Sequence, residues 1–209
     1  TDFKKDQILM SSYSPGGSSL FSDADIPSAM AINNVIPLGG VGQLSNIELD
    51  KFLTGKMVDV NPSVNRLNEK ITGQSSPRDF ETMMQLTYLY FTQPRMDQDA
   101  FDTWKSNTKS RIENASLNPM MSLRDTITKI MTNNNPRGRN MNLDLLSKVD
   151  YNKVMELYKN RFADASDFTF FITGNVNADS ISTLVETYLG SLPSMKRNEK
   201  FKDLGINPE

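Results

Sequence analysis

Apolar and polar residues alternate with a period of two in four stretches of this chain, which is typical of half-buried strands. The first covers residues 6–14, where Ile8 and Met10 alternate with Leu9 and Ser11. Two more follow each other at residues 56–65 and 66–76, and the fourth, residues 167–177, has the highest content of aromatic and β-branched residues. We therefore expect four strands, the middle two joined as neighbours.

Elsewhere the apolar residues recur every three or four positions, which predicts amphipathic helices. The helical stretches are residues 22–38, 45–56, 76–94, 97–116, 118–135, 147–162 and 178–194. Local signals support several of them. Ser45 and Glu48 have the spacing of a capping box, Gly55 follows as a helix-ending residue, and Ser22 and Asp23 are candidate caps for the first helix.

The order of these elements predicts the fold class. Strands separated by helices, with most helices gathered in one block, favour an α+β fold with an antiparallel sheet covered on one face by helices. No polar linker divides the sequence into two self-sufficient cores, so we expect a single domain over residues 1–195. The polar residues 196–209 are typical of a linker-like tail to a following repeat.

Composition limits the chemistry of the chain. It contains no cysteine and no histidine, which removes thiolate chemistry, the usual zinc ligands and the usual general base near neutral pH. With 23 basic and 25 acidic residues, the net charge of −2 gives no electrostatic basis for binding nucleic acid. No apolar run reaches the roughly 20 residues of a membrane span. We expect a soluble domain in which catalysis is disfavoured, although carboxylates, Lys, Ser or Tyr could still supply it.

One segment, residues 26–46, combines features that need an explanation. It reads IPSAMAINNVIPLGGVGQLSN, an apolar helix that carries two adjacent amides, Asn33 and Asn34, and ends in the glycines 39, 40 and 42. The glycines do not form a phosphate-binding loop, since they follow no strand and lack the Lys-Ser/Thr pair. The amides either cap the break at Pro37 or mark a degenerate catalytic helix.

Four motifs in order resemble the insulinase/pitrilysin-type zinc metallopeptidases, the inverzincins, which include the mitochondrial processing peptidases. IPSAMAINNVIPLGG stands where that family has a His-x-x-Glu-His helix and a glycine turn. GQLSNIELDKFLTGKMVDVNPSVN, FDTWKSNTKSRIENASLNP and YKNRFADASDFTFFITGNVNADSISTLVETYLGSLPS resemble its following helix and strand, its long central helix and its closing segment. The resemblance covers nearly the whole chain and implies the processing-peptidase-like repeat fold.

Aligned through Gly39, the resemblance places the two zinc-binding histidines at Met30 and Asn34 and the catalytic glutamate at Asn33. The distant glutamate ligand falls on Arg111. All four residues are replaced by types that bind zinc poorly or repel it. The resemblance thus implies that this repeat has no catalytic residue, cofactor or metal, and that zinc is held by a catalytic repeat elsewhere in the parent protein.

In such a family, a degenerate repeat encloses the substrate and packs against sister repeats. We expect a non-catalytic repeat of a larger zinc metalloendopeptidase that contributes to a substrate-enclosing chamber. Its partners are then sister repeats of the same polypeptide or a homologous subunit, with a substrate peptide as a further candidate partner. The alternative is a stand-alone binding or assembly subunit of the same fold. An independent hydrolase is a weaker option, since no serine lies in a nucleophile elbow.

Other residues with a candidate role have simpler interpretations. Arg137 and Arg139 lie in a polar loop that either binds an acidic peptide or is only solvated. The acids near positions 23 and 97 are expected at helix starts, where the dipole favours them, and Trp104 is expected in the core. The N-terminus has neither an initiator Met nor a signal sequence, so we expect a fragment of a longer chain. The compartment stays open, with a periplasmic or exported parent as one option for a bacterial source.

Overall fold

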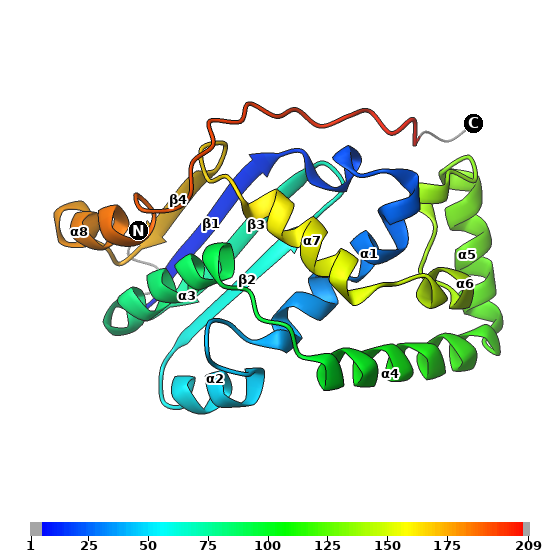
Figure 1. The fold of residues 1–209 in the computed structure, drawn as a ribbon, viewed down its shortest axis with the longest axis horizontal. Helices are drawn as coiled ribbons and strands as arrows, with labels where there is room; N and C mark the ends of the chain where they lie inside the picture. The colour runs from blue at the N-terminus through cyan, green and yellow to red at the C-terminus, as the bar shows by residue number, and fades with distance from the viewer. Residues whose placement is uncertain (1–5, 207–209) are drawn as a thin grey trace.

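The computed structural model describes residues 6–206, and these form a four-stranded sheet with helices packed on one face (Figure 1). The strands are β1 (Ile8–Pro15), β2 (Val58–Val64), β3 (Asn68–Ser75) and β4 (Thr169–Gly174). The helices are α1 (Ile26–Val35), α2 (Asn46–Leu53), α3 (Phe80–Thr92), α4 (Gln98–Ser116), α5 (Pro119–Met131), α6 (Leu143–Ser147), α7 (Tyr151–Phe162) and α8 (Ala178–Tyr188). Short 3₁₀ helices lie at Gly17–Leu20, Asp23–Asp25, Ile36–Gly39, Pro77–Asp79 and Pro136–Gly138.

The sheet is antiparallel throughout, in the order β2-β3-β1-β4. Along β1 the side chains of Ile8, Met10, Ser12 and Ser14 are buried, whereas the intervening residues face solvent. Helices α1, α3 and α7 lie over the buried face in Figure 1, and the opposite face is uncovered. The α+β fold with an antiparallel sheet covered on one face is therefore confirmed.

The core between the sheet and the helices is mostly aliphatic and contains a cluster of aromatic residues. Phe162 is fully buried and stacks on Tyr158, and both Phe91 and Phe168 contact its ring. The Tyr158 hydroxyl donates a 2.9 Å hydrogen bond to the Tyr90 carbonyl oxygen, so its polar end is satisfied inside the core. This cluster holds α7 and α3 against the sheet.

Several local expectations are confirmed and others need correction. The capping box at α2 is present, because Ser45 accepts from the Glu48 amide and Glu48 accepts from the Ser45 amide. However, Ile47 and Phe52 of that helix are exposed, so only part of its apolar stripe is buried. The expected caps of α1 are also wrong, since Asp23–Asp25 forms a 3₁₀ helix and α1 begins after it.

Two features of the fold differ from what the sequence pattern predicts. The strand with the most apolar sequence, β4, lies at an edge of the sheet and Phe171 is exposed. The polar loop of residues 133–142 is followed by the short helix α6, which the sequence pattern did not indicate. Among residues 6–206, no helix has the length and apolar content that crossing a bilayer requires.

Candidate functional site

Helix α1, which carries three of the four candidate positions, ends in a glycine turn that packs against the segment before α4. At Gly39 a Cβ atom would lie 1.9 Å from the carbonyl oxygen of Arg95, so no side chain fits there. The Arg95 guanidinium in turn donates a 2.9 Å hydrogen bond to the Gly39 carbonyl oxygen. This close approach fixes the C-terminal end of α1 beside the start of α4.

The four candidate positions separate into two hollows of the surface. Asn34 and Arg111 line one groove, between α1, the start of α2 and α4. Met30 and Asn33 line a different hollow, next to Val64 and the loop of residues 137–141. Asn34 and Arg111 therefore line the same groove, whereas Asn33 lies at the edge of the sheet.

Asn33 is fully engaged by the backbone of β2. Its side-chain amide donates to the Val64 carbonyl oxygen at 3.1 Å, and its side-chain oxygen accepts from the Val64 amide at 2.8 Å. The register of β2 with β3 turns the N–H and C=O of Val64 towards the free edge, away from β3. Pro62, at another such position, has no N–H to offer. Asn33 and Pro62 together block half of this sheet edge.

The residues at the four positions do not fit a zinc ion. Zinc takes thiolate, imidazole or carboxylate ligands, and this set offers a thioether, two carboxamides and a guanidinium. One of the carboxamides is already committed to Val64. Within residues 6–206 there is also no group of three or more His, Cys, Asp or Glu side chains placed to hold a metal.

The groove beside Asn34 is lined by both apolar and polar side chains. Its floor and walls carry Leu38, Ile47 and Trp104, with the amides of Asn34 and Asn107 and the guanidinium of Arg111 along one side. Trp104 is half-buried rather than fully in the core as expected, and it packs on the Phe101 ring at 5.7 Å. Asp97 and Asp99 also line the groove, so it carries carboxylates and a guanidinium besides its apolar side chains and amides.

The acids at the start of α4 are structural, as expected. Asp97 accepts a 3.1 Å hydrogen bond from the Ala100 amide, and its other oxygen pairs with Arg95 at 3.1 Å. The Ala100 hydrogen bond, followed by that from Arg95, lowers the pKa of the Asp97 carboxyl. Asp97 thus caps α4 and orients the glycine turn at the same time.

Arg137 and Arg139 behave differently from each other. The Arg137 guanidinium donates to the carbonyl oxygens of Ser18 and Phe21, at 2.9 and 2.6 Å, and pairs with Asp23 at 2.7 Å. Only 14% of its side chain is exposed, so the solvated-loop interpretation is wrong for Arg137. Arg139 is exposed, and a contact between it and a substrate stays untested.

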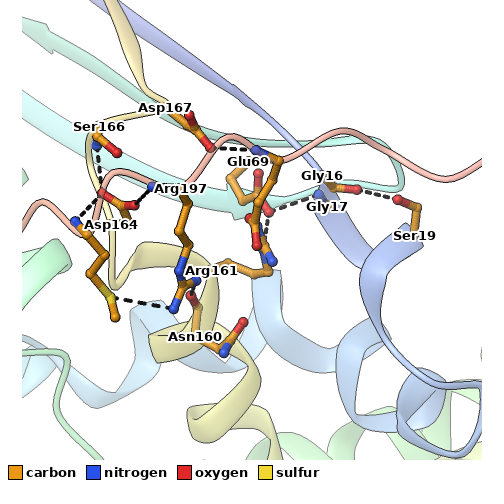
Figure 2. A network of polar contacts seen from close by, with 12 residues as sticks. Gly16, Gly17, Ser19, Glu69, Asn160, Arg161, Asp164, Ser166, Asp167 and Arg197 are labelled. Carbon is orange, nitrogen blue, oxygen red and sulfur yellow. Dashed lines mark hydrogen bonds and ion pairs between the residues drawn. The ribbon is translucent and has the colours of Figure 1, made fainter.

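A buried ion network, which sequence reasoning missed, joins α7 to the start of β3 (Figure 2). Glu69 is fully buried and accepts from the Arg161 guanidinium and from the Gly17 amide. Burial raises the pKa of the Glu69 carboxyl, and the Arg161 charge opposes that rise. Arg161 also pairs with Glu199 of the C-terminal tail. The three residues are far apart in sequence, so no local pattern indicated the network.

The tail is held to the domain by hydrogen bonds from its own backbone. Asp164 accepts from the amides of Met195 and Arg197, at 2.8 and 2.7 Å (Figure 2). Further along, Asp167 accepts from the Glu199 amide and Ser19 accepts from the Lys202 amide, both at 2.9 Å. Residues 196–206 therefore run along the domain, although they form no helix or strand. The tail's role as a link to a following repeat stays a prediction, and residues 1–5 and 207–209 lie outside the described part of the chain.

Comparisons with known proteins support the resemblance. Residues 148–208 match the family model for the Peptidase M16 inactive domain. The chain is 21% identical over 201 residues to a probable zinc protease PqqL of Haemophilus influenzae, covering 96% of this chain and 22% of that protein. It thus spans about a fifth of the length of the curated relatives that it matches.

Solved structures show the same fold. The periplasmic protease PqqL of Escherichia coli superimposes with a TM-score of 0.79 at 16% identity, over 97% of this chain and 22% of that one. A peptidase M16 inactive domain from Pseudomonas fluorescens gives 0.75 at 13% identity, over 96% of this chain and 49% of that one. The chain therefore has the fold of solved M16 peptidase structures, and its C-terminal part matches the model for the domain described as inactive in these peptidases.

Proposed function

We propose that this chain is a non-catalytic domain of a longer zinc metalloendopeptidase, in which it forms part of the chamber around the substrate and packs on sister domains. The observation that carries the proposal is the residue type of Asn33 and the hydrogen bonding of its side chain. At the position that the alignment gives to the catalytic glutamate stands a carboxamide, which cannot act as a base and is bonded to the Val64 backbone.

The length of the relatives supports the larger assembly. About four fifths of the Haemophilus protein has no counterpart in this chain, which leaves room for a catalytic repeat that holds the zinc. The solved Escherichia coli relative is periplasmic. A periplasmic location of the parent is therefore the first to test by cell fractionation.

The groove along α4 is the surface that we assign to the substrate. Asn107 and Arg111 lie one helical turn apart on the groove side of α4. The Asn107 amide can donate to and accept from a peptide backbone, and the Arg111 guanidinium can pair with a carboxylate. Trp104 adds an apolar contact area.

A second candidate function is a stand-alone assembly subunit of the same fold. The solved Pseudomonas chain favours it, because this domain accounts for 49% of that chain, which is far shorter than the Haemophilus protein. The full open reading frame that encodes this chain distinguishes the two candidate functions. A His-x-x-Glu-His repeat in the same frame supports the first, and its absence supports the second.

The substrate role is tested by kinetics of the full-length enzyme. Asn107→Ala and Arg111→Ala should raise KM by about three- to tenfold, because each removes one hydrogen-bonding group from the groove. Lys109→Ala is the matched control, since Lys109 points away from the groove and is 64% exposed. An unchanged KM in both groove variants would contradict the assignment of the groove, and peptidase activity of the 209-residue chain alone would contradict the non-catalytic role.

A further inference from the structure

Helix α5 exposes a continuous apolar stripe. At 100° per residue, five of its side chains fall within one arc of about 100°. They are exposed by 69% (Met120), 54% (Leu123), 51% (Ile127), 66% (Ile130) and 55% (Met131). No residue of α5 is buried within the described part of the chain. The sequence pattern that predicts this helix therefore has no partner inside the domain.

The helix is oriented with its polar side towards the domain. Asp125 accepts a 2.7 Å hydrogen bond from the side chain of Asn140, in the loop that precedes α6. Ser122 and Asp125 line a hollow together with Asn140 and Asn142. An amphipathic helix on a domain surface ordinarily buries its apolar side, and α5 does the reverse. This inverted orientation indicates that the stripe is a contact surface.

The size of the stripe supports the same conclusion. Five long apolar side chains exposed by half or more present roughly 500 Å² of apolar surface, near the upper end of what monomeric proteins leave uncovered. A stable protein contact buries about 800 Å² on each partner, so the stripe can supply the apolar centre of such a contact. Leu117, just before α5, is 82% exposed and extends the surface at one end.

The course of the tail indicates which partner reaches the stripe. Asn135, four residues beyond α5, donates a 2.9 Å hydrogen bond to the carbonyl oxygen of Leu204. Figure 1 shows the described tail ending close to the C-terminal end of α5. The described tail is thus held near the C-terminal end of α5. A domain tethered to this tail would have a high effective concentration at α5.

We propose that the α5 stripe is the docking surface for another domain of the same polypeptide. This inference rests on the proposed function, which places the chain within a longer protein. A membrane surface fits less well, because interfacial helices are rich in lysine and arginine, whereas α5 contains only Arg124 and Lys129 as basic residues and also the acidic Asp125.

Native methionines provide the test, since their oxidation requires access to the side chain. Met120 and Met131 lie in the stripe, and Met195, exposed by 61% elsewhere, serves as the reference. The 209-residue chain and the full-length protein are each given a brief pulse of hydrogen peroxide, and sulfoxide is measured peptide by peptide. In the chain alone all three methionines should oxidise at similar rates. In the full-length protein Met120 and Met131 should oxidise about tenfold more slowly.

A pair of variants controls for indirect protection. The double substitution Leu123→Glu and Ile127→Glu in the full-length protein should restore fast oxidation of Met120 and Met131. Lys129→Glu, on the other side of α5, should leave them protected.

Equal oxidation rates in the two proteins would overturn the proposal, as would a gene product no longer than this chain. Slow oxidation in the 209-residue chain at the mass of a dimer would also overturn it, because the occupant would then be a second copy. Protection of Met120 and Met131 only in the presence of lipid vesicles would also overturn the proposal, because the occupant would then be a membrane. Protection in a full-length protein without peptidase activity would leave the docking surface intact and contradict the proposed function instead.

Discussion

Replacing Arg161 by methionine is expected to destabilise the domain strongly, because it leaves Glu69 without its counter-charge. The Arg161 and Glu69 side chains are 4% and 0% exposed, so water cannot take the place of the guanidinium. One Glu69 oxygen, Oε2, already has no hydrogen-bond partner. Removing one member of a buried ion pair typically costs about 3–5 kcal/mol. For a domain of this size that corresponds to a fall in Tm of roughly 10 °C.

The measurement is urea unfolding of the 209-residue chain, followed by far-UV circular dichroism at pH 7.5. Two further variants separate the buried charge from a general loss of packing. Glu199→Ala removes the tail's contact with Arg161, and because Glu199 is 28% exposed it should cost less than about 1 kcal/mol. The double variant Glu69→Gln with Arg161→Met leaves no buried charge and should be clearly more stable than Arg161→Met alone.

The pH dependence of Arg161→Met gives an independent check. Burial raises the pKa of Glu69, and without Arg161 only hydrogen bonds from backbone amides, such as that of Gly17, oppose that rise. An acid whose pKa is raised in the folded state stabilises it below the unfolded pKa, and that contribution disappears as pH rises through the folded pKa. The penalty of Arg161→Met should therefore shrink between pH 7.5 and pH 5. A loss below about 1 kcal/mol, or one independent of pH, would refute the description of Glu69 as a buried charge.

Two further predictions concern the tail and helix α1. Burial alone would raise the pKa of Asp164, but hydrogen bonds from Ser166 and the tail amides lower it below its ordinary value. Asp164→Asn should thus cost about 1–3 kcal/mol at pH 7. The difference from wild type should begin to shrink below about pH 4, the unfolded pKa, and should be lost as the pH falls through the lowered folded pKa; a constant difference in urea unfolding would contradict this. Asn33→Ala should cost about 1–3 kcal/mol because it leaves the Val64 backbone unpaired. Its neighbour Asn34 is exposed, so Asn34→Ala should change stability by less than about 0.5 kcal/mol, and equal effects would show that the Val64 contact contributes nothing.

Features of the fold that depend on residues close together in the sequence could be predicted from the sequence. The Ser45–Glu48 capping box spans one helical turn, and the alternation along β1 is visible within eight residues. Both signals come from side chains whose partners are close in the chain. They were sufficient for the α+β class and for most of the elements.

The contacts that shape the site depend on residues far apart in sequence. Asn33 meets Val64 across 31 positions, and Arg161 meets Glu69 across 92. The tail looked like a linker because its partners bind its backbone amides, which every residue possesses. Helix α5 was predicted correctly from its period, but the period cannot say whether the apolar side faces the domain or an outside partner. These features needed the three-dimensional structure.

Zinc binding by the 209-residue chain tests the central claim most directly. The chain is dialysed against a slight excess of zinc, then against metal-free buffer, and its metal content is measured alongside its activity on unstructured peptides. The account predicts less than about 0.1 zinc per chain and no peptidase activity, since Met30, Asn33, Asn34 and Arg111 do not form a zinc-ligand set. One tightly bound zinc per chain that is lost on substituting Asn34 would contradict it.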